Sequence, residues 1–384
     1  MASSDEVGRL LDEGIEAVKK GDYPTAIQLW SQAIALDPQD EKALVNRATA
    51  YSQIGNAEGA LADLSAALQI NPNNLHAYFS RANLYNAQRK FKEALADLNK
   101  VIELNPDDAE AYYNRANTMT NAYGHMASFF SGDQKVSNLM GTFNQVMDDY
   151  TQAIKLNPNV AQFYANRSGI QFELLQRMQA QQTRVQQVNT PKMFQQQTVR
   201  KFDPSLADAP LKDINKALEL APNTAIYWKN RGVIKFILLN KVPEALADFT
   251  RAIELDPKFV DALVFRCNAY NRSGKNDLAA ADATRCIELQ PDEANHYFNR
   301  AIARHKLNDH QGALNDLDEV IQRDPKHIKA YPNRAECYTA LGKKKEAVAD
   351  WEQYLALGGG RMFGDEAIVK EKIKKLRSWF PFGR

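Results

Sequence analysis

The sequence has little cysteine, no long apolar run and almost no net charge, and each absence excludes a class of protein. Its three cysteines, Cys267, Cys286 and Cys337, form no C-x-x-C pair, which argues against a disulfide framework and against a zinc site. No uncharged apolar stretch reaches about eighteen residues, and no apolar signal core opens the chain. We therefore expect a soluble chain in a reducing compartment, either the cytoplasm or a plastid stroma if a targeting segment was removed.

The charge balance is nearly neutral. Lys and Arg number 48 and Asp and Glu number 47, which gives a formal net charge of +1. Such a balance gives the chain no overall positive potential, so it does not favour DNA or a membrane surface as a partner of the whole chain. Any electrostatic recognition must therefore depend on a local cluster.

Proline recurs at a fixed interval, usually after Asn or Asp. The intervals are 34, 34, 52, 64, 35, 34 and 34 residues, and they separate Pro38, Pro72, Pro106, Pro158, Pro222, Pro257, Pro291 and Pro325. The two long intervals exceed the period by 18 and 30 residues, as two insertions in a regular array would. About nine repeats therefore fit between residues 7 and 360.

Each period predicts two amphipathic helices separated by a turn, because the proline stops the second helix from continuing into the next repeat. In the first helices a large residue is followed four positions later by a small one, as in Tyr112 and Ala116. The second helices carry two small positions, as at Ala60 and Ala67. Small residues let two helices approach closely while the large ring fills the space beside them.

With this order of aromatic, small, small and proline positions, the chain resembles a tetratricopeptide repeat protein over roughly residues 7–360. The resemblance implies an all-α, right-handed superhelical solenoid of about nine repeats, in which the first helix of each pair lines a concave groove. An N-terminal tail is expected at residues 1–6, and a capping helix with a basic and aromatic tail at residues 361–384. Because each repeat contacts only its neighbours, we expect one solenoid rather than two or three globular domains.

Two charged columns recur together in eight repeats. An Arg precedes the small position of the first helix, at Arg47, Arg81, Arg115, Arg167, Arg231, Arg266, Arg300 and Arg334. An Asp lies on the second helix, at Asp63, Asp97, Asp149, Asp213, Asp248, Asp282, Asp316 and Asp350. The first repeat lacks both. This joint pattern predicts Arg–Asp ion pairs between the two helices, with a basic ladder for an acidic partner as the alternative.

An Asn precedes that Arg in six repeats, at Asn46, Asn114, Asn166, Asn230, Asn299 and Asn333. Helix propensity does not explain such a column, whereas a primary amide can both donate to and accept from an extended peptide backbone. The column is similar to the asparagine ladder of the tetratricopeptide domain of O-linked N-acetylglucosamine transferases, whose catalytic domain is absent here. We therefore predict peptide binding in the groove, with amide bonds between neighbouring helices as the alternative.

Another branch of the family binds chaperone tails of the EEVD type through a carboxylate clamp of Lys, Asn and further basic residues. The candidate positions hold residues of other kinds, namely Leu11, Ile15, Glu110, Tyr113, Ala165 and Val233. The clamp is therefore incomplete, and a chaperone co-factor role is not favoured.

The two insertions fall between the first and second helices of the fourth and fifth repeats. Residues 120–142 are mostly apolar, and we predict that Phe129 and Phe130 dock a partner; packing on the solenoid and disorder are the alternatives. Residues 176–205 are Gln-rich and basic, with candidate docking residues Arg184, Lys192, Arg200 and Lys201. This segment could meet an acidic protein, a lipid surface or RNA, or it could be a solvated linker.

The last segment carries five basic residues, which are Lys370, Lys372, Lys374, Lys375 and Arg377. A polar cap accounts for them, but Trp379, Phe380 and Phe382 exceed what a cap requires. A membrane-surface or partner anchor is the alternative.

Catalytic and metal motifs are missing. The sequence has no H-E-x-x-H, no G-x-S-x-G, no phosphate-binding Gly loop and no paired ligand spacing. We expect no enzyme, no cofactor and no metal, with the six histidines on solvated helix faces. Cys267 and Cys286 occupy the two small positions of one repeat and are interpreted as Ala replacements, with a redox pair as the alternative.

These observations favour a non-enzymatic adaptor or assembly scaffold that holds an extended peptide in its groove and a second protein at its insertions. The alternative is a membrane- or RNA-associated adaptor that acts through the basic insertion and tail. Residues 149–158, DYTQAIKLNP, and the recurrent Asn-Arg-Ala resemble cyanobacterial and chloroplast repeat proteins that help assemble photosynthetic complexes. That resemblance implies a stroma or a bacterial cytoplasm.

Overall fold

The computed structural model describes the backbone of residues 4–127, 134–189 and 203–378. These residues form twenty α-helices and one short 3-10 helix, with no strand among them, which confirms the all-α prediction. The chain divides into two compact units, unit 1 (residues 1–170) and unit 2 (residues 171–384).

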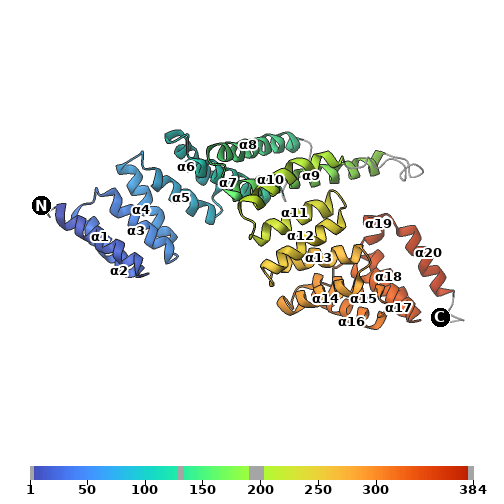
Figure 1. Ribbon diagram of the computed structural model, residues 1–384. Helices are drawn as coiled ribbons and strands as arrows, with labels where there is room; N and C mark the ends of the chain where they lie inside the picture. Colours follow the sequence, from blue (N-terminus) through green and yellow to red (C-terminus); the bar gives the residue numbers. More distant parts are fainter. Residues whose placement is uncertain (1–3, 128–133, 190–202, 379–384) are drawn as a thin grey trace. The chain divides into compact units, whose positions relative to one another are not determined.

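Unit 1 consists of helix pairs, and each helix packs against the one before it and the one after it (Figure 1). The pairs are α1 (Ser4–Lys19) with α2 (Tyr23–Leu36), α3 (Glu41–Gln53) with α4 (Ala57–Ile70), α5 (Leu75–Ala87) with α6 (Phe91–Leu104), and α7 (Ala109–Ala127) with α8 (Gln134–Leu156). Helix α9 (Ala161–Asn189) begins in unit 1 and continues into unit 2.

Unit 2 continues with the short helix η1 (Pro204–Ala207) and α10 (Asp208–Leu220). Its pairs are α11 (Ala225–Ile237) with α12 (Val242–Leu255), α13 (Val260–Arg272) with α14 (Asn276–Leu289), α15 (Ala294–Lys306) with α16 (His310–Arg323), and α17 (Ala330–Ala340) with α18 (Lys344–Ala356). Two further helices follow, α19 (Gly359–Phe363) and α20 (Glu366–Arg377). Neighbouring first helices also touch, so α11, α13, α15 and α17 share a continuous side, which we call the first-helix face.

The Asn or Asp that precedes most of the repeat prolines has a local structural reason. The Asp37 carboxylate accepts a hydrogen bond from the backbone N–H of Gln39 at 2.9 Å, and Asn71 accepts in the same way from Asn73 at 3.0 Å. Such Asx turns reverse the chain where the proline ends the helix. The next helix then begins under a side-chain cap, as where Asp40 Oδ1 accepts from the N–H of Ala43 at 2.9 Å.

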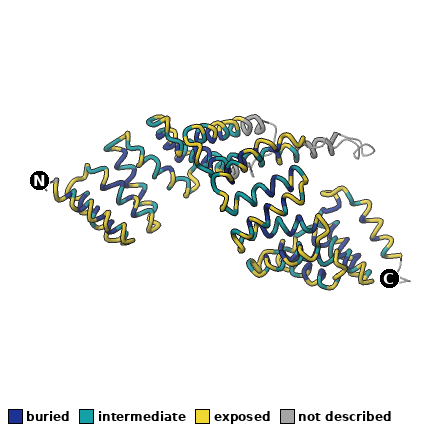
Figure 2. The backbone as a smooth tube through the Cα atoms, in the orientation of Figure 1, coloured by how far each residue is buried: buried dark blue, intermediate teal, exposed yellow. Residues whose placement is uncertain are grey.

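The core follows the small-and-large pattern. Ala60, Ala67 and Ala48 are fully buried and pack with Leu64 and Leu44 in one hydrophobic cluster. Figure 2 shows buried positions along helix sides that face neighbouring helices. Many of these side chains are only a methyl group, so the helices approach closely and larger residues fill the gaps.

The inserted segments lengthen helices instead of forming only loops. Helix α7 has 19 residues, α8 has 23 and α9 has 29, whereas most other helices of the repeats have 13 or 14. No proline interrupts residues 161–189, and their Gln, Arg, Met and Ala are good helix formers, so α9 continues past the length of one repeat. Phe129, Phe130, Lys192, Arg200 and Lys201 lie outside the described residues, and only the backbone of Arg184 is described.

Helix α20 packs on α18 at the C-terminal end of unit 2. Val369 and Ile373 are 2% and 8% exposed and join the cluster that contains Trp351 and Tyr354. Tyr354 Oη donates to the Asp365 carboxylate at 2.9 Å, just before α20 begins. Trp379, Phe380 and Phe382 lie outside the described residues.

Candidate binding face of the first helices

The Arg and Asp columns form ion pairs between the two helices of a repeat. Arg266 donates from Nε to Asp282 at 2.8 Å and from Nη2 at 2.7 Å. The same two-point geometry joins Arg47–Asp63, Arg81–Asp97, Arg115–Asp149, Arg231–Asp248, Arg300–Asp316 and Arg334–Asp350. The predicted pair of Arg167 with Asp213 stays a prediction.

These pairs are mostly buried. The aspartates are 2–6% exposed, and the hydrogen bonds to Asp63 raise the pKa of the Arg47 guanidinium. Paired charges of this kind are stable only because each compensates the other, so both columns serve the fold.

Each Arg also has a third partner, which could not be recognised in the sequence. Nη1 donates to a side-chain oxygen on the second helix of the preceding repeat, as from Arg47 to Ser31 at 3.0 Å and from Arg115 to Asn99 at 2.7 Å. The other acceptors are Ser65, Thr151, Asn215, Thr250, Thr284 and Asp318. Each guanidinium therefore also ties its repeat to the one before, which leaves no support for a basic ladder offered to an acidic partner.

The six predicted asparagines are half-buried, but their side chains have three different surroundings. Asn166 Nδ2 donates to Tyr113 Oη at 3.0 Å and to Asn117 Oδ1 at 2.9 Å, both on α7. Asn117 Oδ1 also accepts from Tyr150 Oη at 2.7 Å, and burial raises the pKa of Tyr150 to about 12, so the phenol remains a donor. Asn166 therefore joins neighbouring helices, as in the alternative interpretation of the column.

Asn114 and Asn333 bond within their own helices. Asn114 Nδ2 donates to the carbonyl of Glu110 at 2.8 Å, and Asn333 Nδ2 donates to that of Lys329 at 2.7 Å. Their amide oxygens stay available, but each has one donor already engaged.

Asn46, Asn230 and Asn299 are different, because their side chains make no hydrogen bond to any residue that the structure describes. Asn230 and Asn299 both belong to unit 2, on α11 and α15. Lys229, next to Asn230, is 15% exposed, with its Nζ 4.0 Å from Asp261 Oδ2, and burial lowers the pKa of its ammonium. These three asparagines are therefore the members of the column whose amides are not used by any described residue.

Other polar bonds join first helices to one another. Asn86 Nδ2 on α5 donates to Thr118 Oγ1 on α7 at 2.8 Å, and Lys306 Nζ on α15 donates to the carbonyl of Asn271 on α13 at 2.8 Å. These bonds fix the spacing of the first helices. The surface that carries the asparagines is therefore held in place before any ligand binds.

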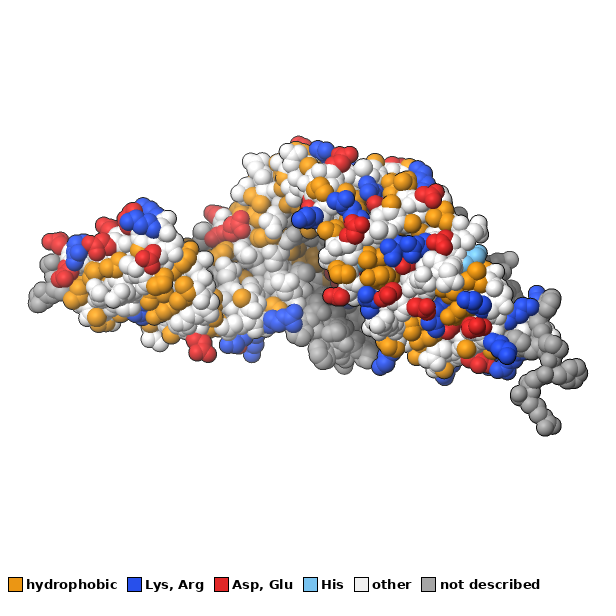
Figure 3. All heavy atoms as spheres, turned by 90° about the horizontal axis from the view of Figure 1, so that it is seen from below, with side chains coloured by type: hydrophobic (Ala, Val, Ile, Leu, Met, Phe, Trp, Pro, Cys, Tyr) orange, Lys and Arg blue, Asp and Glu red, His pale blue; other side chains and the backbone are white. Residues whose placement is uncertain are grey.

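Unit 2 also holds an open cavity of about 560 Å³ over α14. It is lined by Arg266, Ala280, Ala281, Asp282, Thr284, Arg285, Glu288, Arg300 and Arg304, and none of the six asparagines is among them. Arg266 and Arg300 are already paired with aspartates, so the cavity is not an unopposed basic pocket. Figure 3 likewise shows acidic and basic side chains interspersed on the face that it displays.

The interpretation of the histidines as residues of solvated faces was wrong for His296. This side chain is 4% exposed, its Nε2 lies 3.1 Å from Gln290 Oε1, and burial lowers its pKa. It lies in the first turn of α15, and its partner Gln290 is the C-terminal cap residue of the preceding helix α14.

Cys267 and Cys286 are buried and not bonded to each other. Burial raises the pKa of both thiols to about 12, so both stay protonated near neutral pH. These two residues act as small packing residues.

Family models confirm what the repeat pattern indicated. A tetratricopeptide repeat model matches residues 11–74, 239–294, 266–328 and 298–361, and a related TPR repeat model matches residues 82–121. Together these matches cover more than half of the chain, and the protein belongs to the tetratricopeptide repeat family.

One solved structure supports the fold, and two others are similar over parts of the chain. A tetratricopeptide repeat protein from Parabacteroides merdae is similar with a TM-score of 0.51 at 16% identity, over 78% of this chain and 99% of that chain. YrrB, a TPR protein with an unusual peptide-binding site, is similar over 61% of this chain and 95% of its own, with a TM-score of 0.42 at 18% identity. The first TPR of Spaghetti, solved with an HSP90 peptide, has a TM-score of 0.30 at 28% identity, over 31% of this chain and 94% of that chain.

Among the described residues, no helix combines the length and the apolar character that a membrane crossing requires.

Proposed function

We propose that this protein is a non-enzymatic interaction scaffold whose first-helix face binds an extended peptide segment. Tetratricopeptide repeats generally mediate protein–protein interaction or peptide binding, and the fold is typically a scaffold rather than an enzyme. The observation that carries the proposal is the pair Asn230 and Asn299, half-buried on the first helices of unit 2 with their amides unengaged among the described residues.

The chemistry of the pair favours a peptide backbone. Each amide offers two donors and one acceptor, and a strand of peptide must satisfy both its N–H and its C=O groups when it leaves water. Phe265 stands at the equivalent position of the repeat between them and is packed on Phe249, with ring centroids 5.8 Å apart. The two amides therefore lie on either side of the apolar Phe265 position. This order suits a peptide whose backbone contacts alternate with an apolar side chain.

Asn46 offers the same chemistry in unit 1 and is proposed as a separate contact there. The docking role of Phe129 and Phe130 and of the basic insertion stays part of the proposal. A finer role, the assembly of a photosynthetic complex in a stroma or bacterial cytoplasm, rests on the resemblance of residues 149–158 alone.

The membrane- or RNA-associated alternative is weakened by the ion pairs of α20. Lys372 Nζ lies 2.6 Å from Glu336 and Lys370 Nζ lies 2.7 Å from Glu366, while Arg377 pairs with Glu352. Acidic neighbours thus occupy three of the five basic residues of this segment. Binding through phosphates would in addition weaken steeply as salt increases, whereas capture by neutral amides would not.

The proposal predicts a loss of peptide affinity when the two amides are removed. Peptides selected from a random display library against the full chain should bind about 30-fold more weakly to the double variant Asn230→Ala, Asn299→Ala, because each lost amide contact is worth roughly 1 kcal/mol. Fluorescence anisotropy with a labelled peptide measures this affinity at two salt concentrations.

The matched control replaces exposed asparagines outside the first helices, as in Asn223→Ala with Asn315→Ala. This control should bind like the wild type. An unchanged dissociation constant in the Asn230 and Asn299 variant, with an unchanged melting curve, would reject groove capture by these amides.

A further inference from the structure

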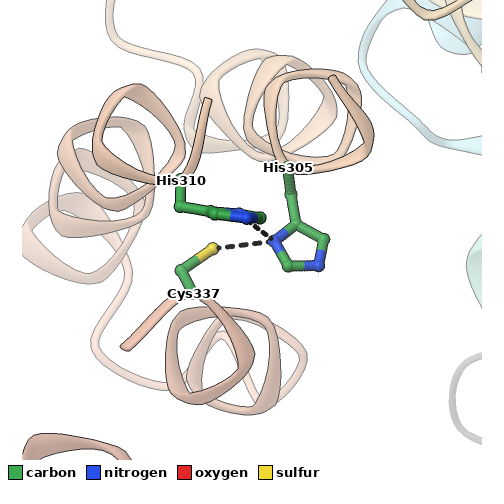
Figure 4. A group of neighbouring side chains, drawn as sticks. All are labelled: His305, His310 and Cys337. Carbon is green, nitrogen blue, oxygen red and sulfur yellow. Dashed lines mark hydrogen bonds between the residues drawn. The ribbon is translucent and has the colours of Figure 1, made fainter. Parts of the chain in front are cut away.

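Two histidines and a cysteine converge at the junction of the last two repeats of unit 2 (Figure 4). His305 lies in the last turn of α15, His310 is the first residue of α16 and Cys337 lies on α17. His305 Nδ1 is 3.2 Å from His310 Nδ1 and 3.2 Å from Cys337 Sγ, and all three atoms lie within 4.8 Å of one another. Three donor atoms of the kind that bind transition metals thus point at one spot.

The spacing fits a metal ion better than it fits hydrogen bonds. A neutral imidazole nitrogen either donates one proton or accepts through one in-plane lone pair, so His305 Nδ1 cannot bond well to two partners at once. In a tetrahedral zinc site, with bonds of about 2.0–2.1 Å to nitrogen and 2.3 Å to sulfur, neighbouring donor atoms are about 3.3–3.6 Å apart. The two distances of 3.2 Å are close to this value.

A metal ion that binds here displaces the thiol proton of Cys337, because the thiolate and not the thiol is the metal ligand.

We infer that His305, His310 and Cys337 form a Zn²⁺ site of the His₂Cys type, with water at the fourth position. Mixed imidazole and thiolate ligands suit Zn²⁺ and do not suit Mg²⁺ or Ca²⁺, which prefer oxygen. Cys337 is fully buried and the histidines are half-buried, so the sulfur lies inside the protein and the open position lies on the histidine side.

The site would fasten three helices of two repeats. Its ligands come from α15, α16 and α17, so bound zinc adds a link across a junction that otherwise depends on side-chain contacts. Because an ion that binds only the folded state stabilises it by mass action, zinc should stabilise this end of unit 2. The inference does not depend on peptide binding.

Titration of the full chain, stripped with a chelator, tests the site. Isothermal titration calorimetry with ZnCl₂ should show one ion per chain, and MgCl₂ should show no binding. Co²⁺ in place of Zn²⁺ should give a thiolate-to-cobalt charge-transfer band in the near ultraviolet. Zn²⁺ should also raise the melting temperature of the wild type.

Variants of the ligands identify the residues. His310→Gln and Cys337→Ser should each weaken zinc affinity about 100-fold or more, and Cys337→Ser should abolish the cobalt band. Because the His310 side chain is only half-buried, we expect His310→Gln to fold, so this variant tests the site even if Cys337→Ser unfolds. The matched controls His327→Gln and Cys286→Ala should bind zinc like the wild type.

Two results would overturn the inference. One is a wild-type chain that binds no Zn²⁺ at millimolar concentration. The other is a folded His310→Gln variant that keeps wild-type zinc affinity and the cobalt band, because the ion would then be bound elsewhere.

Discussion

Replacing Arg266 with alanine is expected to lower the free energy of unfolding by about 3–5 kcal/mol, because the change leaves a buried carboxylate without its partner. Asp282 is 6% exposed, and both of its oxygens accept from Arg266. The substitution also removes the bond to Thr250 on the preceding second helix. Urea unfolding followed by circular dichroism measures the change.

Two other arginines of unit 2 provide the control. Lys235 Nζ lies 2.6 Å from Asp248 and Arg304 Nη1 lies 2.9 Å from Asp316, so the aspartates beside Arg231 and Arg300 keep a cation when their Arg is removed. Arg231→Ala and Arg300→Ala should therefore cost less than Arg266→Ala. In a double-mutant cycle, Arg266→Ala with Asp282→Ala should cost less than the sum of the single changes. Strict additivity would show that the two side chains do not interact.

Placing carboxylates under α20, as in Val369→Asp with Ile373→Asp, should release this helix from α18. An uncompensated buried carboxylate costs several kcal/mol, which exceeds what the contacts of one short helix supply. Release of α20 would expose Trp351 and Tyr354 on α18, because Val369 and Ile373 pack in the same cluster. Hydrogen exchange followed by mass spectrometry should then rise in residues 344–377 and stay unchanged in unit 1, since repeats stabilise mainly their neighbours.

The control for this prediction is Ile368→Asp, which lies on the same helix and is 62% exposed. This substitution should change the hydrogen exchange of α18 and α20 only slightly. If the hydrogen exchange of the α18 amides stayed the same in the double variant, α20 would not stabilise the last repeat.

The repeat fold could be predicted because each of its causes is local. A proline every 34 residues ends one helix, and an Asx turn before it reverses the chain, as Asp37 does. The Arg–Asp pairs were also predictable, because the two columns are present or absent together and are 16 or 17 residues apart in six of the eight repeats. The third partner was missed because its residue type varies between Ser, Thr, Asn and Asp, and only the shared oxygen acceptor matters.

The site could be predicted only in part, because the environment of a side chain depends on other helices. Asn166 and Asn230 occupy the same position of the repeat, yet Tyr113 and Asn117 engage the first, whereas no described residue engages the second. The proposed metal ligands could not be recognised in the sequence for a similar reason. His305 and Cys337 are 32 residues apart in no known motif, and only the stacking of α15 on α17 brings them together.

The measurement that tests the central claim most directly is a crystal structure of the full chain with a library-selected peptide. The account predicts an extended peptide on the first helices of unit 2, with backbone N–H or C=O groups about 2.7–3.2 Å from the amides of Asn230 and Asn299. A peptide bound in the cavity over α14, or elsewhere with both amides still unengaged, would contradict it.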